Sequence, residues 1–130
     1  MAQRIVHYQN GEVIIRAGKL EKKMYIILDG KVNIHLSDGT NKIVVAELIK
    51  GDFFGEISLF NNTPRTATAV AVGDVKLTYI DNPDQLKLFL LKNPTFAAKM
   101  VHVLASRLAS TNELLLGKVS ELNRIKLTHS

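Results

Sequence analysis

A glycine, a glutamate and an arginine lie near one another in the stretch FFGEISLFNNTPRTATAVA, residues 53–71. Gly55 and Glu56 come before a polar turn, and Arg65 follows that turn within an alternating apolar segment. The planar guanidinium of arginine suits bidentate binding of phosphate or carboxylate, and a charge among packed apolar residues is costly unless it is paired. The pattern therefore predicts either an anion site at Arg65 or a structural ion pair between Arg65 and Glu56.

The residues after Gly55 have the composition of one short helical turn, from Glu56 to Phe60. The first N–H groups of such a turn have no partner within it and can bind an anion. Glycine at position 55 allows close approach because it has no side chain. A glycine turn alone is weak support for a phosphate site, and it is the later arginine that strengthens this hypothesis.

Short segments rich in valine, isoleucine and threonine fill residues 4–79 and predict many short β-strands in a sandwich or barrel. Turn sequences separate these segments at Asn10-Gly11, Asp29-Gly30, Lys50-Gly51-Asp52 and Gly73-Asp74. Residues 24–40 predict a strand, a tight turn at Asp29-Gly30 and a returning strand, since Asp-Gly favours the positive φ angles of hairpin turns.

Two helices are expected after the barrel. Pro83 suits the first turn of a helix, which Asn93-Pro94 ends, and a longer helix is expected from about Thr95 to Arg124. We see no internal repeat and no linker. We therefore expect a single domain over residues 1–130, with a barrel at about 4–80 and C-terminal helices at about 83–126.

The longer helix carries an apolar seam at alternating spacings of three and four. Six of its eight positions are apolar; the seam consists of Val101, Leu104, Leu108, Thr111, Leu115, Lys118, Leu122 and Ile125. Such a stripe is typical of a coiled-coil contact, although a helix that packs on its own barrel needs a similar one. A helix of ~30 residues spans ~45 Å, more than a barrel of ~80 residues covers. We expect the seam to join two chains in a homodimer.

The composition limits the class of protein. The 130 residues include 46% hydrophobic residues, enough for one core, and no cysteine, which excludes disulfides and thiolate chemistry. With no signal peptide and no apolar run of ~20 residues, we expect a soluble cytoplasmic protein without membrane contacts. The net charge of +5 is scattered along the chain, so we expect no nucleic-acid contact by this chain alone.

Catalysis is not expected of this chain. An enzyme would need a nucleophile with a base, or a cluster of metal ligands. The four histidines, His7, His35, His102 and His129, have no ligand-like spacing with carboxylates. We therefore expect no catalytic residue, no metal and no cofactor.

The segment GDFFGEISLFNNTPRTATA, residues 51–69, closely resembles the phosphate-binding cassette of cyclic nucleotide-binding domains. These domains occur in the catabolite activator protein and in the regulatory subunits of cyclic-nucleotide-dependent kinases. The resemblance covers nearly the whole chain and includes Gly11, Gly18, Tyr25, Gly30 and the helices. It implies a mainly β fold, an antiparallel β-roll like a jelly-roll barrel, with a short cassette helix and a long C-terminal helix.

The resemblance assigns roles to the cassette residues. The phosphate would be bound by Arg65 and by backbone N–H groups near Ile57, Ser58 and Ala67. Glu56 would accept a hydrogen bond from the ribose 2′-hydroxyl, and Gly55 would let the sugar lie close. The implied ligand is a cyclic nucleoside monophosphate, and the implied function is that of a sensor or regulatory module in signal transduction.

Further residues match the pocket of the family, each with a plainer alternative. Thr66 would bind the phosphate or a guanine amino group, or would simply fill a strand; Val45 and Leu48 would line the pocket, or an ordinary core. On the long helix, Thr111 and Asn112 would bind the exocyclic amine of the purine, and Arg107 would reach Glu56. The alternatives there are a tolerated polar seam position and a solvated arginine. We expect cAMP to be favoured over cGMP, with the long helix acting as a lid.

The chain also departs from the family pattern. It begins almost at the first strand, and the segment KLEKKM, residues 19–24, lacks the usual glycine-acidic turn. No output domain follows the long helix, so the chain is either a stand-alone sensor or the sensor part of a longer parent such as a transcription regulator. The other alternative is an interaction module of the same fold that binds no nucleotide.

Overall fold

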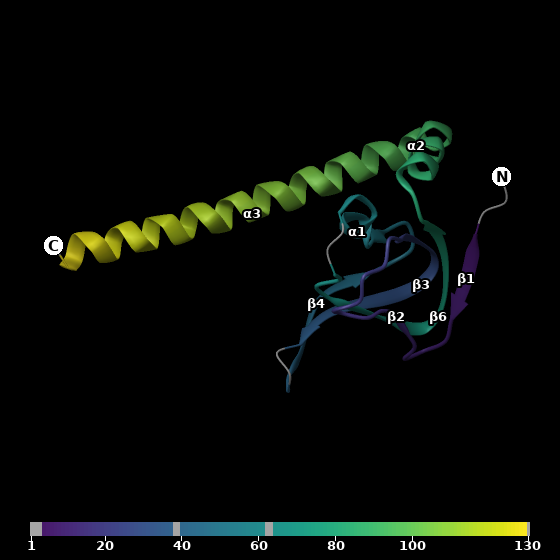
Figure 1. Ribbon diagram of the computed structural model, residues 1–130, viewed down its shortest axis with the longest axis horizontal. Helices are drawn as coiled ribbons and strands as arrows, with labels where there is room; N and C mark the ends of the chain where they lie inside the picture. Colours follow the sequence, from purple (N-terminus) through teal and green to yellow (C-terminus); the bar gives the residue numbers. More distant parts are fainter. Residues whose placement is uncertain (1–3, 38–39, 62–63, 130) are drawn as a thin grey trace. The chain divides into compact units, whose positions relative to one another are not determined.

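The computed structural model describes residues 4–37, 40–61 and 64–129 (Figure 1). The chain divides into two compact units, one up to Lys87 and one from Leu88 onward. The expectation of a single domain over residues 1–130 stays a prediction.

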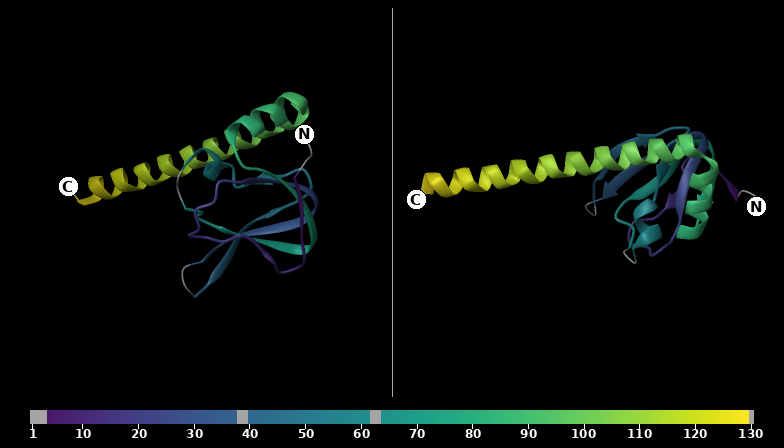
Figure 2. Two further views of the ribbon diagram at one scale, coloured as in Figure 1. Left: turned by 45° about the vertical axis from the view of Figure 1, so that its right-hand side comes forward. Right: turned by 90° about the horizontal axis from the view of Figure 1, so that it is seen from above.

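The first unit is an antiparallel sheet with one short helix. Its elements are β1 (Ile5–Tyr8), β2 (Val13–Ile15), β3 (Met24–Ser37), β4 (Lys42–Leu48), β5 (Phe53–Phe54), α1 (Glu56–Phe60) and β6 (Thr68–Ile80). The strand order is β1-β6-β3-β4, while β2 pairs with β6 and β5 pairs with β3. All these pairings are antiparallel, and the strands curl into a roll (Figure 2). The predicted mainly β fold is confirmed.

The core of this unit lies inside the roll. Its buried residues come from four strands, β2, β3, β5 and β6, and are Ile14, Ile15, Tyr25, Ile27, Val32, Phe54, Ala69, Ala71, Val75 and Leu77. Tyr25 stands opposite Phe54 in the ladder, and the two rings stack with their centroids 5.3 Å apart. Because β5 leads directly into the cassette helix, this pairing brings the start of β3 beside the cassette.

The prediction of a hairpin turn at Asp29-Gly30 is wrong. β3 continues through both residues, and it pairs with β6 on either side of them, with register shifts between Ile27 and Asp29 and between Asp29 and Lys31. Gly30 has φ +94°, and a Cβ there would lie 2.5 Å from the carbonyl oxygen of Asp74. The Asp-Gly pair therefore forms a bulge where β3 passes close to β6, since this conformation and approach both require glycine.

The two C-terminal helices agree with the sequence signals. α2 runs from Pro83 to Lys92, and Asn82 Oδ1 accepts a hydrogen bond from the Gln85 N–H at 2.8 Å as an N-cap. After Asn93, α3 runs from Pro94 to His129, five residues beyond the expected end. In the described part of the chain, neither helix is long and apolar enough to cross a membrane.

Candidate functional site

Gly55 connects β5 to α1 and has a backbone conformation that requires glycine. Its φ is +83°, in the left-handed region, and it is the N-cap residue of α1. A Cβ at this position would lie 2.7 Å from Arg65 Nη1, 2.9 Å from the Lys23 carbonyl oxygen and 3.3 Å from Ile15 Cδ1. The absence of a side chain at position 55 therefore makes room for the guanidinium of Arg65.

Arg65 is buried, with 6% of its surface exposed. Its Nη1 donates a hydrogen bond to the Gly55 carbonyl oxygen at 2.9 Å, and its Nη2 donates to the Lys23 carbonyl oxygen. The backbone of Arg65 is held as well, because its N–H donates to Lys19 O and its carbonyl accepts from the Gly18 N–H, both at 2.8 Å. The guanidinium is therefore fixed at the start of the cassette helix.

The charge of Arg65 is incompletely compensated by its surroundings. Burial lowers the pKa of Arg65, and the nearby Glu21, Tyr25 and Glu56 raise the pKa without restoring its usual value. The buried Nε atom has no hydrogen-bond partner among the described residues. A buried cation with a spare donor is suited to binding an anion, since a charge-assisted hydrogen bond would offset its desolvation.

Glu56 and Ser58 are buried in α1, with 8% and 5% of their surfaces exposed, whereas Ile57 is exposed. The one-turn helix predicted over Glu56–Phe60 is confirmed with the same bounds. Glu56 contributes to the electrostatic environment of Arg65, but less than Glu21 and Tyr25 do. The hydrogen bonds described for the guanidinium go to the carbonyls of Gly55 and Lys23, and the alternative of a structural pair between Glu56 and Arg65 stays open.

The remaining site residues of the first unit differ in exposure. Val45 is 52% exposed and lies in a bulge of β4, between the pairs Ile34–Ala46 and His35–Val44. Leu48 packs against the core, Thr66 is exposed and Ala67 is half-buried directly before β6. Their expected contacts with a ligand stay predictions.

Arg107, Thr111 and Asn112 all lie on α3, in the second unit. The side chains of Arg107 and Asn112 are exposed, and that of Thr111 lies outside the described part. The side chains of four seam positions also lie outside the described part: Leu115, Lys118, Leu122 and Ile125. The lid and the base contacts therefore stay predictions.

Two interactions of Arg65 were not predicted from the sequence. The carbonyl of Lys23 accepts a hydrogen bond from Arg65, and the carboxylate of Glu21 raises the pKa of Arg65. Both residues belong to the segment before β3 in which the sequence departs from the family pattern. The Lys23 contact could not be predicted, because every residue has a main-chain carbonyl. Glu21 could have been noticed, since it is a lone acidic residue among lysines.

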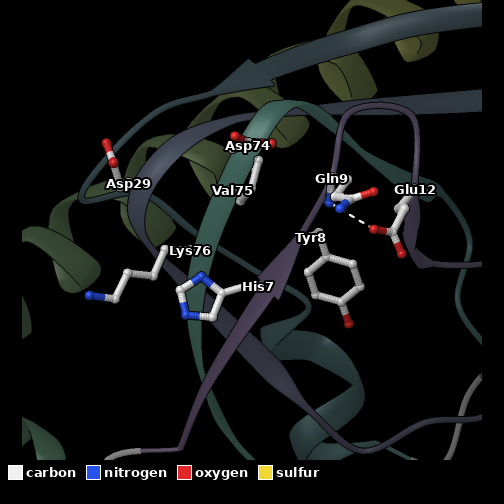
Figure 3. Close-up of a pocket in the computed structure, with 8 residues that line it drawn as sticks. All are labelled: His7, Tyr8, Gln9, Glu12, Asp29, Asp74, Val75 and Lys76. Atoms are coloured by element: carbon white, nitrogen blue, oxygen red, sulfur yellow. Dashed lines mark hydrogen bonds between the residues drawn. The ribbon is translucent and has the colours of Figure 1, made fainter.

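A pocket of about 470 Å³ lies elsewhere on the first unit (Figure 3). It is lined by His7, Tyr8, Gln9, Glu12, Asp29, Asp74, Val75 and Lys76. None of these residues belongs to the cassette, so the cavity does not mark the arginine site. Among the residues that the structure describes, no group of three or more His, Cys, Asp or Glu side chains is placed to hold a metal ion.

Residues 5–91 match the family model described as "Cyclic nucleotide-binding domain". The CRP-like cAMP-activated global transcriptional regulator of Mycobacterium tuberculosis is 31% identical over 109 residues, which cover 82% of this chain and 48% of that protein. The cAMP-dependent protein kinase regulatory subunit of Dictyostelium discoideum is 40% identical over 80 residues, covering 58% of this chain and 24% of that protein.

Among solved structures, the catabolite activator protein of Thermus thermophilus superposes with a TM-score of 0.73 at 29% identity. The superposition covers 87% of this chain and 53% of that one. The chain thus spans half or less of the length of these two curated relatives, and about half of the solved structure.

Proposed function

Because the chain belongs to the cyclic nucleotide-binding domain family, we propose that it binds a cyclic nucleoside monophosphate and acts as a regulatory sensor module. The buried guanidinium of Arg65 carries this proposal. It lies against Gly55 at the start of α1, and its Nε is a free donor among the described residues. A phosphate at this position would gain charge-assisted hydrogen bonds that a neutral ligand cannot make.

In the proposed complex, Arg65 binds the cyclic phosphate, and the backbone N–H groups of Ile57, Ser58 and Ala67 complete the site. Two features of the site support this arrangement: the absence of a Cβ at Gly55 and the rigid placement of Arg65 by two backbone hydrogen bonds. Val45, Leu48 and Thr66 belong to the same proposed pocket.

Calorimetric titration with cAMP, cGMP and a cyclic dinucleotide tests this function. We expect cAMP to bind more tightly than cGMP, because Thr111 and Asn112 offer two groups to adenine whereas Thr66 offers one to guanine. One neutral hydrogen bond is worth about 0.5–1.5 kcal/mol, so the preference should be modest, about tenfold. A folded chain that binds none of the three ligands would contradict the proposal and favour an interaction module without nucleotide binding.

Glu56→Gln should weaken cAMP binding by about 0.5–1.5 kcal/mol, less than the loss of Arg65, because glutamine keeps an acceptor but loses the charge that strengthens a hydrogen bond to the ribose 2′-hydroxyl. The buried position of Glu56 makes a circular dichroism check of folding necessary. The decisive measurement repeats the titration with 2′-deoxy-cAMP, for which the loss should shrink. Equal losses with both ligands would show that Glu56 has a structural role.

The long helix α3 acts in this proposal as a lid and as a dimer contact. A ligand shifts an equilibrium between two conformations only by its difference in affinity for them, and contacts between the purine and α3 would supply that difference. Three seam residues of α3 are substantially exposed, Val101 at 69%, Leu104 at 36% and Leu108 at 63%. A second copy of the same seam would bury them.

Leu108→Lys should convert the proposed dimer into a monomer, because it places a charge in the apolar seam. Light scattering should report twice the mass of one chain for the wild type and a single mass for the variant. Ala109→Lys is the matched control, since position 109 is exposed and lies outside the seam. A wild-type chain that stays monomeric at high concentration would contradict the dimer and favour packing of α3 on its own barrel.

A second candidate is the sensor part of a longer transcription regulator. Its support is the mycobacterial regulator, which matches this chain over 82% of the chain but over only 48% of its own length. In such a protein, an output domain would respond to the ligand-induced conformational change of α3. A transcript or gene model that continues beyond Ser130 would favour this candidate over a stand-alone sensor.

A further inference from the structure

The segment between β2 and β3 contacts both the backbone and the guanidinium of Arg65. Lys19 and Lys23 each contribute a carbonyl oxygen to Arg65 through a hydrogen bond, one to its backbone N–H and one to its Nη2. Residues 16–23, RAGKLEKK, carry four basic side chains and one acidic side chain, Glu21. A lone carboxylate therefore lies within a basic segment that contacts the proposed phosphate-binding arginine.

Glu21 is held in place by a buried tyrosine. Tyr25 OH donates a hydrogen bond to Glu21 Oε1 at 3.0 Å, and Lys23 Nζ lies 3.8 Å from the same oxygen. Tyr25 is only 3% exposed, and its ring stacks on Phe54. Because that ring is fixed by the core, the position of the Glu21 carboxylate is restricted as well.

Glu21 lies between Lys19 and Lys23, whose carbonyl oxygens both accept hydrogen bonds from Arg65, so its carboxylate is held near the guanidinium. Its charge acts to raise the pKa of Arg65, against the effect of burial. Its carboxylate is bonded to Tyr25 and Lys23, so its attraction for Arg65 acts across space. An anion that approaches Arg65 is attracted by the guanidinium and repelled by Glu21. The same carboxylate therefore raises the stability of the folded chain and lowers its affinity for an anion.

We propose that Glu21, held by Tyr25, stabilises the folded chain through Arg65 and lowers the affinity of the Arg65 site for its anionic ligand. This inference rests on the proposed function, because it takes the ligand to be a cyclic nucleotide phosphate. Glu21 touches no ligand atom in this proposal. It sets the affinity through the charge of its carboxylate.

The test compares Glu21→Gln with the wild type by calorimetry with cAMP and by urea unfolding without ligand. Glutamine keeps an acceptor for Tyr25 OH and removes the charge. We expect cAMP to bind about threefold to tenfold more tightly, and the urea midpoint of the chain without ligand to fall. A merely structural role of Glu21 would instead lower both the affinity and the midpoint, and that result would overturn the proposal.

Glu12→Gln is the matched control. It makes the same change of net charge, and Glu12 Oε1 likewise accepts a hydrogen bond, from the Gln9 N–H at 2.8 Å. Glu12 is exposed and is not among the groups that shift the pKa of Arg65. The affinity of the Glu12→Gln variant for cAMP should stay within twofold of that of the wild type. An equal gain in both variants would mean that net charge alone is responsible and would also overturn the proposal.

A double-mutant cycle measured without ligand tests the coupling of Glu21 and Arg65 independently of the proposed function. Urea unfolding is measured for the wild type, Glu21→Gln, Arg65→Ala and the double variant. The fall in midpoint caused by Glu21→Gln should disappear when Arg65 is alanine, because the two charges act on each other. A fall of the same size in both backgrounds would refute the coupling. A wild-type chain that binds no cyclic nucleotide would overturn both the proposed function and the proposed effect of Glu21 on affinity. The double-mutant cycle would still show whether Glu21 and Arg65 stabilise each other.

Discussion

Arg65→Ala should weaken cAMP binding by at least about 1.5–3 kcal/mol, roughly tenfold to more than a hundredfold, while the fold persists. The guanidinium is the buried cation of the site, and a phosphate bound to it would be shielded from water. Hydrogen bonds between charged groups are stronger there than at an exposed position. Calorimetry with the wild type and the variant measures the loss directly.

The controls for this variant address folding and net charge. Arg65→Ala leaves the carbonyl oxygens of Gly55 and Lys23 without their guanidinium donor, so circular dichroism and urea unfolding must accompany the titration. Arg16→Ala removes the same charge from an exposed position in the neighbouring segment and should leave the affinity almost unchanged. Unchanged affinity in folded Arg65→Ala would refute the phosphate assignment.

Arg65→Lys separates charge from shape within the same site. Lysine keeps a positive charge but lacks the planar fork that donates at once to Gly55 O, to Lys23 O and to a ligand. We expect an affinity between those of the wild type and Arg65→Ala. If the lysine variant binds cAMP as tightly as the wild type, the net charge alone holds the phosphate.

The sequence predicted those elements whose signals are local. The bounds of α1 and α2 follow from Gly55, Pro83 and Asn93-Pro94, which act within one turn of the helix they begin or end. Asp29-Gly30 shows the limit of such signals. The dipeptide favours positive φ in a turn and in a bulge alike, and the carbonyl of Asp74, distant in the sequence, decides for the bulge.

For the candidate site, the sequence predicted the residues with a side-chain or glycine signal and missed those that contribute main-chain atoms. Gly55 and Arg65 were predicted from their residue types and spacing, and the structure brings them together across a 2.9 Å hydrogen bond. The role of Lys23 was not predictable, because its contribution is a main-chain carbonyl that every residue possesses. The proposed role of Glu21 depends on its hydrogen bond to Tyr25 and on the pairing of β3 with β5 beside the cassette, which only the folded chain reveals.

Gly55→Ala should destabilise the chain and weaken cAMP binding together. An alanine must adopt φ near +83°, which costs about 1–2 kcal/mol for an L-residue. Its Cβ would also lie 2.7 Å from Arg65 Nη1 and 2.9 Å from the Lys23 carbonyl oxygen, so the arginine must move. We expect a total loss of stability of about 2–4 kcal/mol, in the range of strain combined with a broken buried hydrogen bond. Urea unfolding measures the first effect and calorimetry the second.

Gly11→Ala isolates the conformational strain from the clash. Gly11 has φ +85°, almost the same as Gly55, but a Cβ there would meet no atom within 4 Å. This variant should therefore lose about 1–2 kcal/mol of stability from the backbone alone and should bind cAMP with unchanged affinity, because Arg65 is not displaced. If Gly55→Ala costs no more stability than Gly11→Ala and binds cAMP equally well, the close approach of Arg65 to Gly55 does not shape the site. A larger cost confined to position 55, with loss of affinity, would mean that the glycine serves the arginine and, through it, the phosphate.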